Sequence, residues 1–330
     1  MSGSAATEPP VLELRNLVTR FRMGRTDLLA VRRVDLEIRR REMLGIIGES
    51  GSGKSVTGLS ILRLLPPHAT VTADRMAFAG QDLLALDDAS FRELRGTHLA
   101  MVFQNPVGAF NPAKTIGWHL DRIIVRAATR TDRLGRDLDR NARRWLGEVG
   151  IAYPERILPL YPHQLSGGML QRTLIALATA LQPDLLIADE PTTNLDNIVE
   201  RQIIGLFRRL KDRLGSAIIF ITHDISLAAG LCDRIAVMYA GEIVETAPAE
   251  RLLRSPAHPY TVGLIETARQ LDRRAERLQE IPGELPSGMI EATGCLFAPR
   301  CAFAVDACRT APPPDVSLAP GHSVRCIRYG

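Results

Sequence analysis

The octapeptide "GESGSGKS", Gly48–Ser55, restricts the possible folds of this chain more than any other stretch. It fits the pattern G-x-x-x-x-G-K-[ST] in full and lies between a run typical of a buried strand, "EMLGII", and a run typical of a helix, "VTGLSILRLL". In that context the loop amides and the helix N-terminus surround a phosphate chain with fixed positive dipoles. The sequence therefore predicts a nucleoside triphosphate site, with Lys54 on the β- and γ-phosphates and the Ser55 hydroxyl on Mg²⁺.

Two other interpretations of these glycines are weaker. A flexible linker has no reason to lie between a strand and a helix. A Rossmann dinucleotide loop spaces its glycines differently from positions 48, 51 and 53 and has no use for a lysine.

A second run, "LLIADE", supplies acidic groups. Its four apolar residues predict a strand through the core that ends at Asp189, which we expect to hold Mg²⁺ through a water. Glu190 follows directly and is suited to polarise an attacking water as general base. With the phosphate loop, this pair predicts hydrolysis of a nucleoside triphosphate.

The rest of the chain divides by its patterning. "VLELRNLVTRFRM" and "AVRRVDLEIRR" alternate as strands with one exposed face do, and "MAFAG" and "LAMVFQ" predict further strands. Residues 105–181 are helical in character, "SAIIFITHD" is a buried strand, and "RIAVMYAGEIVETA" is a closing hairpin. After about Pro256, prolines and cysteines with little periodicity predict an appended module.

Composition excludes some classes of function. The net charge of the 330 residues is only +4 and is spread in short arginine runs, which argues against a dedicated nucleic-acid binder. We interpret the seven arginines between Arg126 and Arg144 as a solvated helix face. The N-terminus lacks the pattern of a signal peptide, and no run of 18 uncharged apolar residues occurs. We expect a cytoplasmic protein whose membrane role, if any, comes through a partner.

The stretch "LSGGMLQR" is an unusual start for a helix. Ser166 is a good cap, but Gly167 and Gly168 each cost about 1 kcal/mol relative to alanine and leave backbone amides bare. A ligand that needs bare amides would explain the pair.

Taken together, these stretches resemble the ATPase subunits of ABC transporters, from about residue 11 to residue 330. The resemblance implies an α/β fold: a P-loop (RecA-like) ABC ATPase core with an N-terminal antiparallel β subdomain, a helical subdomain insert and a small Cys-rich C-terminal extension. "LSGGMLQR" is similar to the signature loop of that family. By this resemblance Ser166, Gly167 and Gly168 bind the γ-phosphate of an ATP held by the other subunit, which answers the question of the bare amides.

The resemblance also assigns the remaining motifs. Gln104, at the end of the strand "MVFQ", matches the Q-loop glutamine on Mg²⁺ and the nucleophilic water, and Asp196 lies in the D-loop at the dimer interface. His223 matches the switch histidine on the γ-phosphate, so the implied catalytic residues are Glu190, His223 and Gln104. The implied contacts to ATP and Mg²⁺ are Phe21 (stacked on adenine), Gly48, Ser50, Gly51, Ser52, Gly53, Lys54, Ser55, Val56, Gln104, Asp189 and His223. Asn194 and Asn197 depart from the usual D-loop and leave communication across the interface in question.

The C-terminal stretches "SPAHPYTVGLI", "IPGELPS" and "GCLFAPRCAFAVDACRTAPP" resemble the extension of importers of dipeptides, oligopeptides and nickel. We therefore expect an ABC ATPase domain at residues 1–255, with its helical subdomain at about 105–181, and the extension at residues 256–330. The implied protein energises uptake of di- and oligopeptides at the cytoplasmic face of the plasma membrane, as a peripheral subunit. The alternatives are an importer of nickel or another small solute, a soluble ABC ATPase without a permease, and a regulatory ATPase that barely hydrolyses ATP.

The implied partners are a homologous second ATPase forming a heterodimer, two transmembrane permease subunits, and an extracytoplasmic solute-binding protein. No nucleic-acid partner is expected.

Four cysteines fall in the extension, Cys295, Cys301, Cys308 and Cys326. Cytosolic disulfides are rare, so four thiols among turn-forming residues suit a tetrathiolate metal site. Their spacing fits neither a C-x2-C zinc finger nor a bacterial ferredoxin run. The resemblance to peptide importers implies a [4Fe–4S] cluster, with Zn²⁺ and free thiols as alternatives, and its expected role is to hold a small domain together. Cys232 is expected to be a buried apolar filler.

Overall fold

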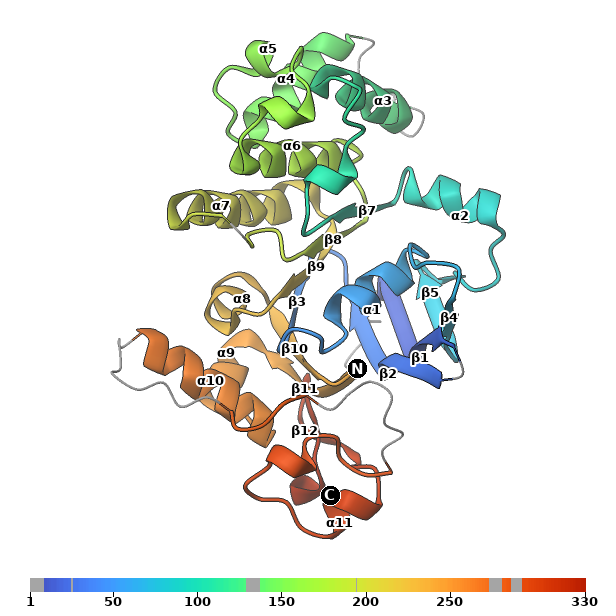
Figure 1. The fold of residues 1–330 in the computed structure, drawn as a ribbon, viewed down its shortest axis with the longest axis vertical. Helices are drawn as coiled ribbons and strands as arrows, with labels where there is room; N and C mark the ends of the chain where they lie inside the picture. Colours follow the sequence, from blue (N-terminus) through green and yellow to red (C-terminus); the bar gives the residue numbers. More distant parts are fainter. Residues whose placement is uncertain (1–8, 25, 129–136, 194, 273–280, 286–292) are drawn as a thin grey trace, which may run out of the picture. The chain divides into compact units, whose positions relative to one another are not determined.

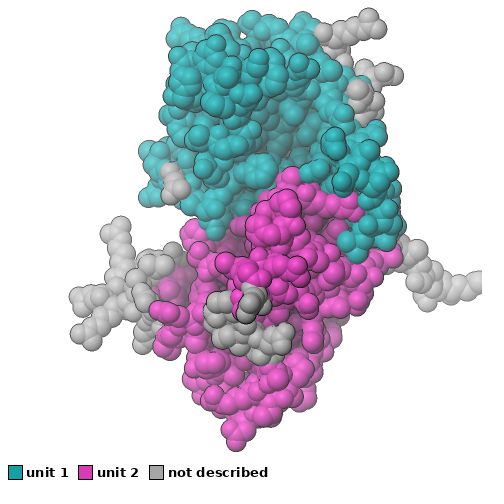
Figure 2. Space-filling model, turned by 45° about the vertical axis from the view of Figure 1, so that its right-hand side comes forward, with its two compact units in different colours: residues 1–11, 39–42, 79–219 teal, residues 12–38, 43–78, 220–330 magenta. Residues whose placement is uncertain are grey.

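The computed structural model describes residues 9–24, 26–128, 137–193, 195–272, 281–285 and 293–330. The chain divides into two compact units, coloured separately in Figure 2. Unit 1 comprises residues 1–11, 39–42 and 79–219, and unit 2 comprises residues 12–38, 43–78 and 220–330. This division follows contacts rather than sequence order, and the sequence domains 1–255 and 256–330 stay a prediction.

An antiparallel β subdomain belongs to unit 2 (Figure 1). Strand β1 (Leu12–Met23) pairs antiparallel with β2 (Thr26–Ile38), β4 (Ala69–Thr72) and β5 (Arg75–Phe78). Alternate residues of β1 are buried, such as Leu12 and Leu14, as the sequence alternation predicts. Buried Thr19 Oγ1 lies 2.8 Å from Ser60 Oγ of α1 (Lys54–Ile61), so this sheet packs against the helix that follows the phosphate loop.

Unit 2 also holds the strand that leads into the phosphate loop. Strand β3 (Met43–Ile47) is buried throughout and pairs in parallel with β10 (Arg234–Tyr239), which forms the predicted hairpin with β11 (Glu242–Pro248). The C-terminal strands β13 (His322–Arg325) and β12 (Asp315–Ala319) continue this sheet from β11. The helices of unit 2 are α1, α8 (Ile225–Leu231), α9 (Ala249–Arg254), α10 (Pro259–Asp272) and α11 (Ala307–Thr310).

Unit 1 carries the predicted helical insert. Its strands are β6 (Gln81–Asp82), β7 (Leu99–Val102) and β8 (Leu185–Asp189), and its helices are α2 (Asp88–Arg95), α3 (Ile116–Ala128), α4 (Leu138–Glu148), α5 (Pro154–Ile157), α6 (Gly167–Ala180) and α7 (Asn197–Leu214). Strands β7 and β8 pair in parallel, and β9 (Ala217–Thr222) runs from unit 1 into unit 2. Helices α3, α4 and α6 pack together (Figure 1). Helices α3 and α4 each bury one apolar stripe, for example Ile116, Leu120 and Ile124 of α3, whereas α6 is buried at most positions from Leu170 to Ala180.

The structure corrects two expectations from the sequence. The stretch after Pro256, expected to have little periodicity, contains α10, and Pro259 occupies the first helical position, where its missing N–H costs nothing. The extension also contributes β13, which pairs with β11. Strand β7 ends at Val102, so Gln104 follows the strand instead of ending it. Part of the arginine run, residues 129–136, and Asn194 lie outside the described residues.

Among the described residues, no helix combines the length and the apolar character that a bilayer-spanning segment requires.

A buried carboxylate fastens the C-terminal strands to the rest of unit 2. Glu245 of β11 is 1% exposed and accepts hydrogen bonds from the backbone N–H groups of Ala257 and His258, both at 2.8 Å. It also accepts one from Nε2 of buried His322, at 2.9 Å, at the start of β13. One side chain thus joins three separate segments.

Replacing Glu245 with alanine is expected to lower the free energy of unfolding by about 3–5 kcal/mol. The reason is that the buried N–H groups of Ala257, His258 and His322 lose their hydrogen-bond acceptor. The matched control is Glu250→Ala, which removes a salt bridge to Arg254 whose two side chains are 75% and 76% exposed. That change should cost at most about 1 kcal/mol. Denaturant unfolding of the two variants checks this, and equal losses would contradict the role given to Glu245.

Candidate functional site

The phosphate loop of unit 2 joins β3 to α1. Lys54 is 4% exposed, and its Nζ donates to the carbonyl oxygens of Gly48 at 2.9 Å and Glu49 at 2.8 Å. These carbonyls hold the ammonium group inside the curve of its own loop. The structure thus places the predicted lysine where the G-x-x-x-x-G-K-[ST] pattern puts it, at the first turn of α1.

Neighbouring backbone leaves no room for side chains at two loop glycines. A Cβ on Gly48 would lie 2.1 Å from the Met238 carbonyl oxygen, and one on Gly53 would lie 2.4 Å from the Ala30 carbonyl oxygen. Gly53 also has φ +103°, which only glycine adopts readily. The N–H of Gly241, in the turn of the β10–β11 hairpin, donates to the Ser52 carbonyl at 2.8 Å. The hairpin and β2 therefore fix the shape of the loop.

The other predicted ATP contacts of unit 2 differ in exposure. Ser50 and Gly51 are exposed, Ser52 is fully buried, and Ser55 and Val56 are half-buried. Phe21 of β1 is half-buried, with its ring centroid 5.9 Å from that of His68. His223 is exposed directly after β9. Its neighbour Asp224 caps α8 by accepting from Leu227 N, which fixes where the strand ends.

In unit 1, β8 ends in the predicted acidic pair. Asp189 is 6% exposed, and Glu190 has φ +43°, a left-handed backbone that costs a residue other than glycine of the order of 1 kcal/mol. Glu190 Oε2 accepts from Gln104 Nε2 at 3.0 Å and from Thr193 Oγ1 at 2.8 Å. The structure brings Gln104 and Glu190 together across 86 positions of sequence. Thr193 was not anticipated, although its place three residues after Glu190 suits a local hydrogen bond.

The glycine pair lies at the start of α6, as the sequence predicts. Ser166 is the N-cap, and its Oγ accepts from Met169 N at 3.4 Å. Ser166 and Gly167 are exposed, and a Cβ on Gly167 would meet open space. A Cβ on Gly168 would lie 3.1 Å from Val199 of α7, so packing accounts for this second glycine. Asp196 caps α7, accepting from Ile198 N and Val199 N.

The four cysteines of the extension line one small cavity of about 20 Å³, together with His258 and Phe297. Burial raises the pKa of the Cys295 thiol to about 11 and also raises that of Cys326, so at neutral pH these thiols are protonated unless a metal ion displaces the protons. In the described part of the chain, no three His, Cys, Asp or Glu side chains stand in metal-ligand geometry. Cys232 lies elsewhere, buried as predicted and next to Gly45.

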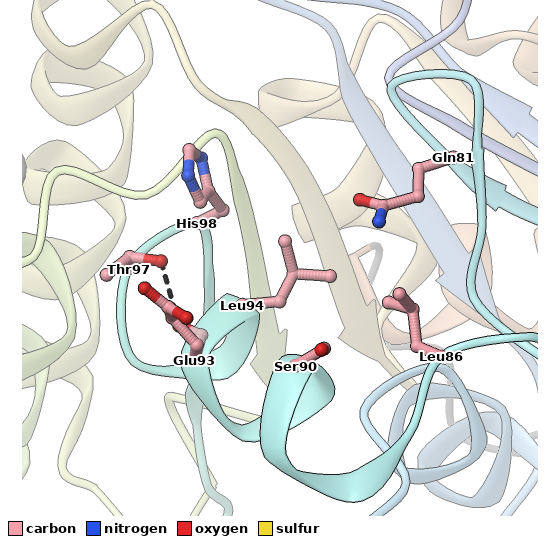
Figure 3. A pocket seen from close by; sticks show the side chains of 7 residues that line it. All are labelled: Gln81, Leu86, Ser90, Glu93, Leu94, Thr97 and His98. Carbon is pink, nitrogen blue, oxygen red and sulfur yellow. Dashed lines mark hydrogen bonds between the residues drawn. The ribbon is translucent and has the colours of Figure 1, made fainter.

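A larger cavity of about 390 Å³ lies beside α2 in unit 1 (Figure 3). Ser90, Glu93 and Leu94 of α2 line it, followed in the chain by Thr97 and His98, and Gln81 and Leu86 complete the lining. Thr97 Oγ1 donates to the Glu93 carbonyl at 2.8 Å. This cavity contains none of the residues predicted to bind ATP.

The phosphate loop with its buried lysine and the acidic end of β8 are the parts of a P-loop nucleotide hydrolase. Comparison with known proteins names the branch. The family described as ABC transporter matches residues 31–193, and the family described as Oligopeptide/dipeptide transporter, C-terminal region, matches residues 244–308.

Full-length relatives agree. A probable peptide ABC transporter ATP-binding protein of Sinorhizobium fredii is 45% identical over 96% of this chain and 95% of its own length. A putative peptide import ATP-binding protein of Brucella melitensis is 42% identical over 97% of both chains. Among solved structures, the dimeric ABC transporter cassette MJ0796 is similar with a TM-score of 0.64 and 28% identity, covering 72% of this chain and 98% of that one.

The chain belongs to the family of ABC transporter ATP-binding proteins. Membership confirms the predicted ABC ATPase fold and the predicted ATP-hydrolysing activity.

Replacing Gly53 with alanine is expected to weaken ATP binding by at least about tenfold, because the new Cβ meets the Ala30 carbonyl oxygen and adds to left-handed strain. Gly51→Ala is the matched control: Gly51 has φ +80° but open space around its Cβ position, so it carries the strain without the clash. Titration with Mg-ATP and thermal unfolding of both variants measure the difference. If the two variants lost affinity equally, the close approach of β2 to the loop would not be what excludes a side chain.

Proposed function

We propose that this chain is the ATP-binding and ATP-hydrolysing subunit of a bacterial ABC importer that takes up di- and oligopeptides through a separate permease pair. One observation carries the proposal. An ABC transporter region and an oligopeptide/dipeptide-type C-terminal region occur together in this chain, which aligns with nearly the whole length of relatives named for peptide import.

Within that function, the residues of the phosphate loop bind the triphosphate. Lys54 is already held at the loop by the carbonyls of Gly48 and Glu49, so its ammonium group is positioned before a phosphate arrives. Ser55 and Gln104 would hold Mg²⁺ directly and Asp189 would hold it through a water, and the bound ion would neutralise the developing phosphate charge. Phe21 stacks on adenine.

Glu190 acts as general base in the hydrolysis. Its carboxylate takes a proton from the attacking water, which displaces ADP from the γ-phosphorus and leaves inorganic phosphate. The hydrogen bonds from Gln104 and Thr193 to Oε2 hold the Glu190 carboxylate in position. His223 contacts the γ-phosphate and keeps the water in line.

A second subunit completes each nucleotide site. Exposed Ser166 and Gly167 offer the N-terminal amides of the 14-residue helix α6, a favourable place for an anion that comes from outside the chain. We infer that these groups, with Gly168 and Asp196, contact ATP held by a homologous partner. The two solved structures of the MJ0796 cassette, which this chain resembles, are described as dimeric.

The complete importer then contains this subunit, a distinct homologous ATPase, two transmembrane permease subunits and an extracytoplasmic solute-binding protein. The helical subdomain at about 105–181 contacts the permease, and the ATPase pair lies at the cytoplasmic face of the plasma membrane. Because ATP joins the two subunits, its binding and hydrolysis drive closure and opening.

The four-cysteine cavity is the proposed site of a [4Fe–4S] cluster, with Zn²⁺ as the alternative. Four thiols around one cavity are the ligand set that both groups require. The cavity of about 20 Å³ has room for little more than one water, so a cluster requires the thiols to move outward, and a single ion less so. Either group would crosslink segments that have few apolar residues to pack.

The import function is tested in proteoliposomes that hold the assembled transporter and its binding protein. We expect ATP-dependent uptake of labelled di- and tripeptides by the wild type. Glu190→Gln should reduce both peptide uptake and ATP turnover at least about 100-fold while ATP stays bound. The matched control is Glu250→Gln, an exposed glutamate of α9 outside the helical subdomain, which should behave as wild type.

Other outcomes contradict the proposal in identifiable ways. Uptake of nickel without peptide uptake would favour the nickel importer. Brisk turnover by a protein that never co-purifies with a permease would favour a soluble ABC ATPase. Wild-type turnover by Glu190→Gln would remove Glu190 from the role of base.

Metal analysis of anaerobically purified protein tests the cysteine site. We expect about four irons per chain with a broad visible absorption for the cluster, or about one zinc for the alternative. Cys295→Ser should lose the metal, whereas Cys232→Ala, outside the cavity, should keep it. Wild-type protein without metal under these conditions would leave the cysteines as free thiols.

A further inference from the structure

The C-terminal extension reaches the phosphate loop through one arginine. Arg300 ends the short 3-10 helix Ala298–Arg300, between Cys295 and Cys301. Its Nη1 donates to Glu49 Oε2 at 2.9 Å and its Nη2 to Glu49 Oε1 at 3.1 Å. Glu49 is the second residue of the phosphate loop, so the two ends of this pair lie 251 positions apart in sequence.

The extension holds the guanidinium group in place. Arg300 Nε donates to the Pro282 carbonyl at 2.8 Å, and Nη2 donates to the Ile281 carbonyl at 3.0 Å. The Arg300 side chain is 6% exposed, and that of Glu49 is 27% exposed. A bidentate pair with a buried, hydrogen-bonded cation is among the stronger polar contacts in proteins, unlike the exposed ion pairs of the surface.

Glu49 is also held through its backbone. Its N–H donates to the hydroxyl of Tyr260, a fully buried residue of α10, at 2.9 Å. Its carbonyl accepts from Lys54 Nζ at 2.8 Å. The extension therefore holds Glu49 by its side chain and its N–H, and the carbonyl of Glu49 is one of the two that position Lys54.

Aromatic packing stiffens this connection. The ring centroids of Tyr239, Tyr260 and Phe297 lie 4.7 to 5.5 Å apart, in tilted and edge-on arrangements. Phe297 also lines the four-cysteine cavity. Because these rings are closely packed, a displacement of the residues that line the four-cysteine cavity would be transmitted to the phosphate loop.

The positive charge of Arg300 has a second effect, on the electrostatics of the phosphate loop. A carboxylate within a loop that binds a polyanion is electrostatically unfavourable, since like charges at short range repel. The Arg300 cation compensates the charge of Glu49 and fixes its position. Without Arg300, the uncompensated carboxylate would oppose the triphosphate.

We propose that Arg300 is a positioning residue for the ATPase reaction and acts through Glu49. The C-terminal extension thereby contributes to ATP binding. The inference goes beyond peptide import and does not depend on the metal in the cysteine cavity.

The test measures Mg-ATP affinity of the purified chain, with KM and kcat of the ATPase activity of the assembled transporter. Arg300→Met should raise Kd and KM by about tenfold, the scale of one hydrogen bond to a charged group, with kcat changed less than about twofold. In the Glu49→Gln background the same change should have less than about a twofold effect, because no charge remains to compensate.

Arg309→Met is the matched control, an exposed arginine of the same extension, and should leave Kd and KM unchanged. Arg300→Lys should fall between wild type and Arg300→Met, because it keeps the charge and loses the bidentate geometry. If Arg300→Met does not fold, Arg300→Lys with and without Glu49→Gln supplies the same comparison.

Wild-type Kd in Arg300→Met would overturn the proposal. So would a loss that persists undiminished in the Glu49→Gln background, or an equal loss in Arg309→Met. Binding of ATP by the isolated chain is independent of what the transporter carries, so these failures differ from a failure of the import function.

Discussion

Close backbone packing around the phosphate loop is the constraint on which the rest of unit 2 depends. The loop passes within contact distance of Ala30 on β2 and Met238 on β10, and the β10–β11 turn bonds to it at Gly241. Those segments come from two separate parts of the sequence, so the loop acquires its shape only when the strands around it are in place. Lys54, buried and held by loop carbonyls, depends on that shape in turn.

In unit 1, the position of the Glu190 side chain is fixed mainly by residues close to it in the sequence. The left-handed backbone of Glu190 turns the chain at the end of β8, and Thr193 bonds back to the carboxylate three residues earlier. Gln104 arrives from the neighbouring parallel strand β7. Strained backbone at a strand end that carries a polar network is typical of functional sites, because the surrounding fold must hold a conformation that the residue itself disfavours.

Much of this was predictable from the sequence, and the failures have physical causes. Alternation predicted β1 and β2, apolar runs predicted β3, β8 and β9, and the phosphate-loop pattern located Lys54, because each of these signals is local. Helix α10 was missed because the prolines and cysteines after Pro256 gave the stretch little periodicity, although a proline is well tolerated at the first position of a helix. Gln104 was assigned to a strand end two residues too far along, the usual uncertainty of element boundaries.

Contacts between distant residues were beyond sequence reasoning. Neither the pairing of β13 with β11 nor the bond from Arg300 to Glu49 has a periodic signal, since each depends on where two remote segments finally meet. The four cysteines are the exception. Their shared chemistry suggested that they converge, and they line one cavity, but the ligand geometry of a metal site is not formed among the described residues.

The extension is joined to the rest of unit 2 at two places. One core cluster among its described residues consists of Ala257, Val324 and Cys326, with Val316 and Leu318 packed against it. The buried Glu245 network joins this cluster to β11. Arg300 and Tyr260 join the extension to the phosphate loop. The contacts at this second place are the same contacts that hold Glu49.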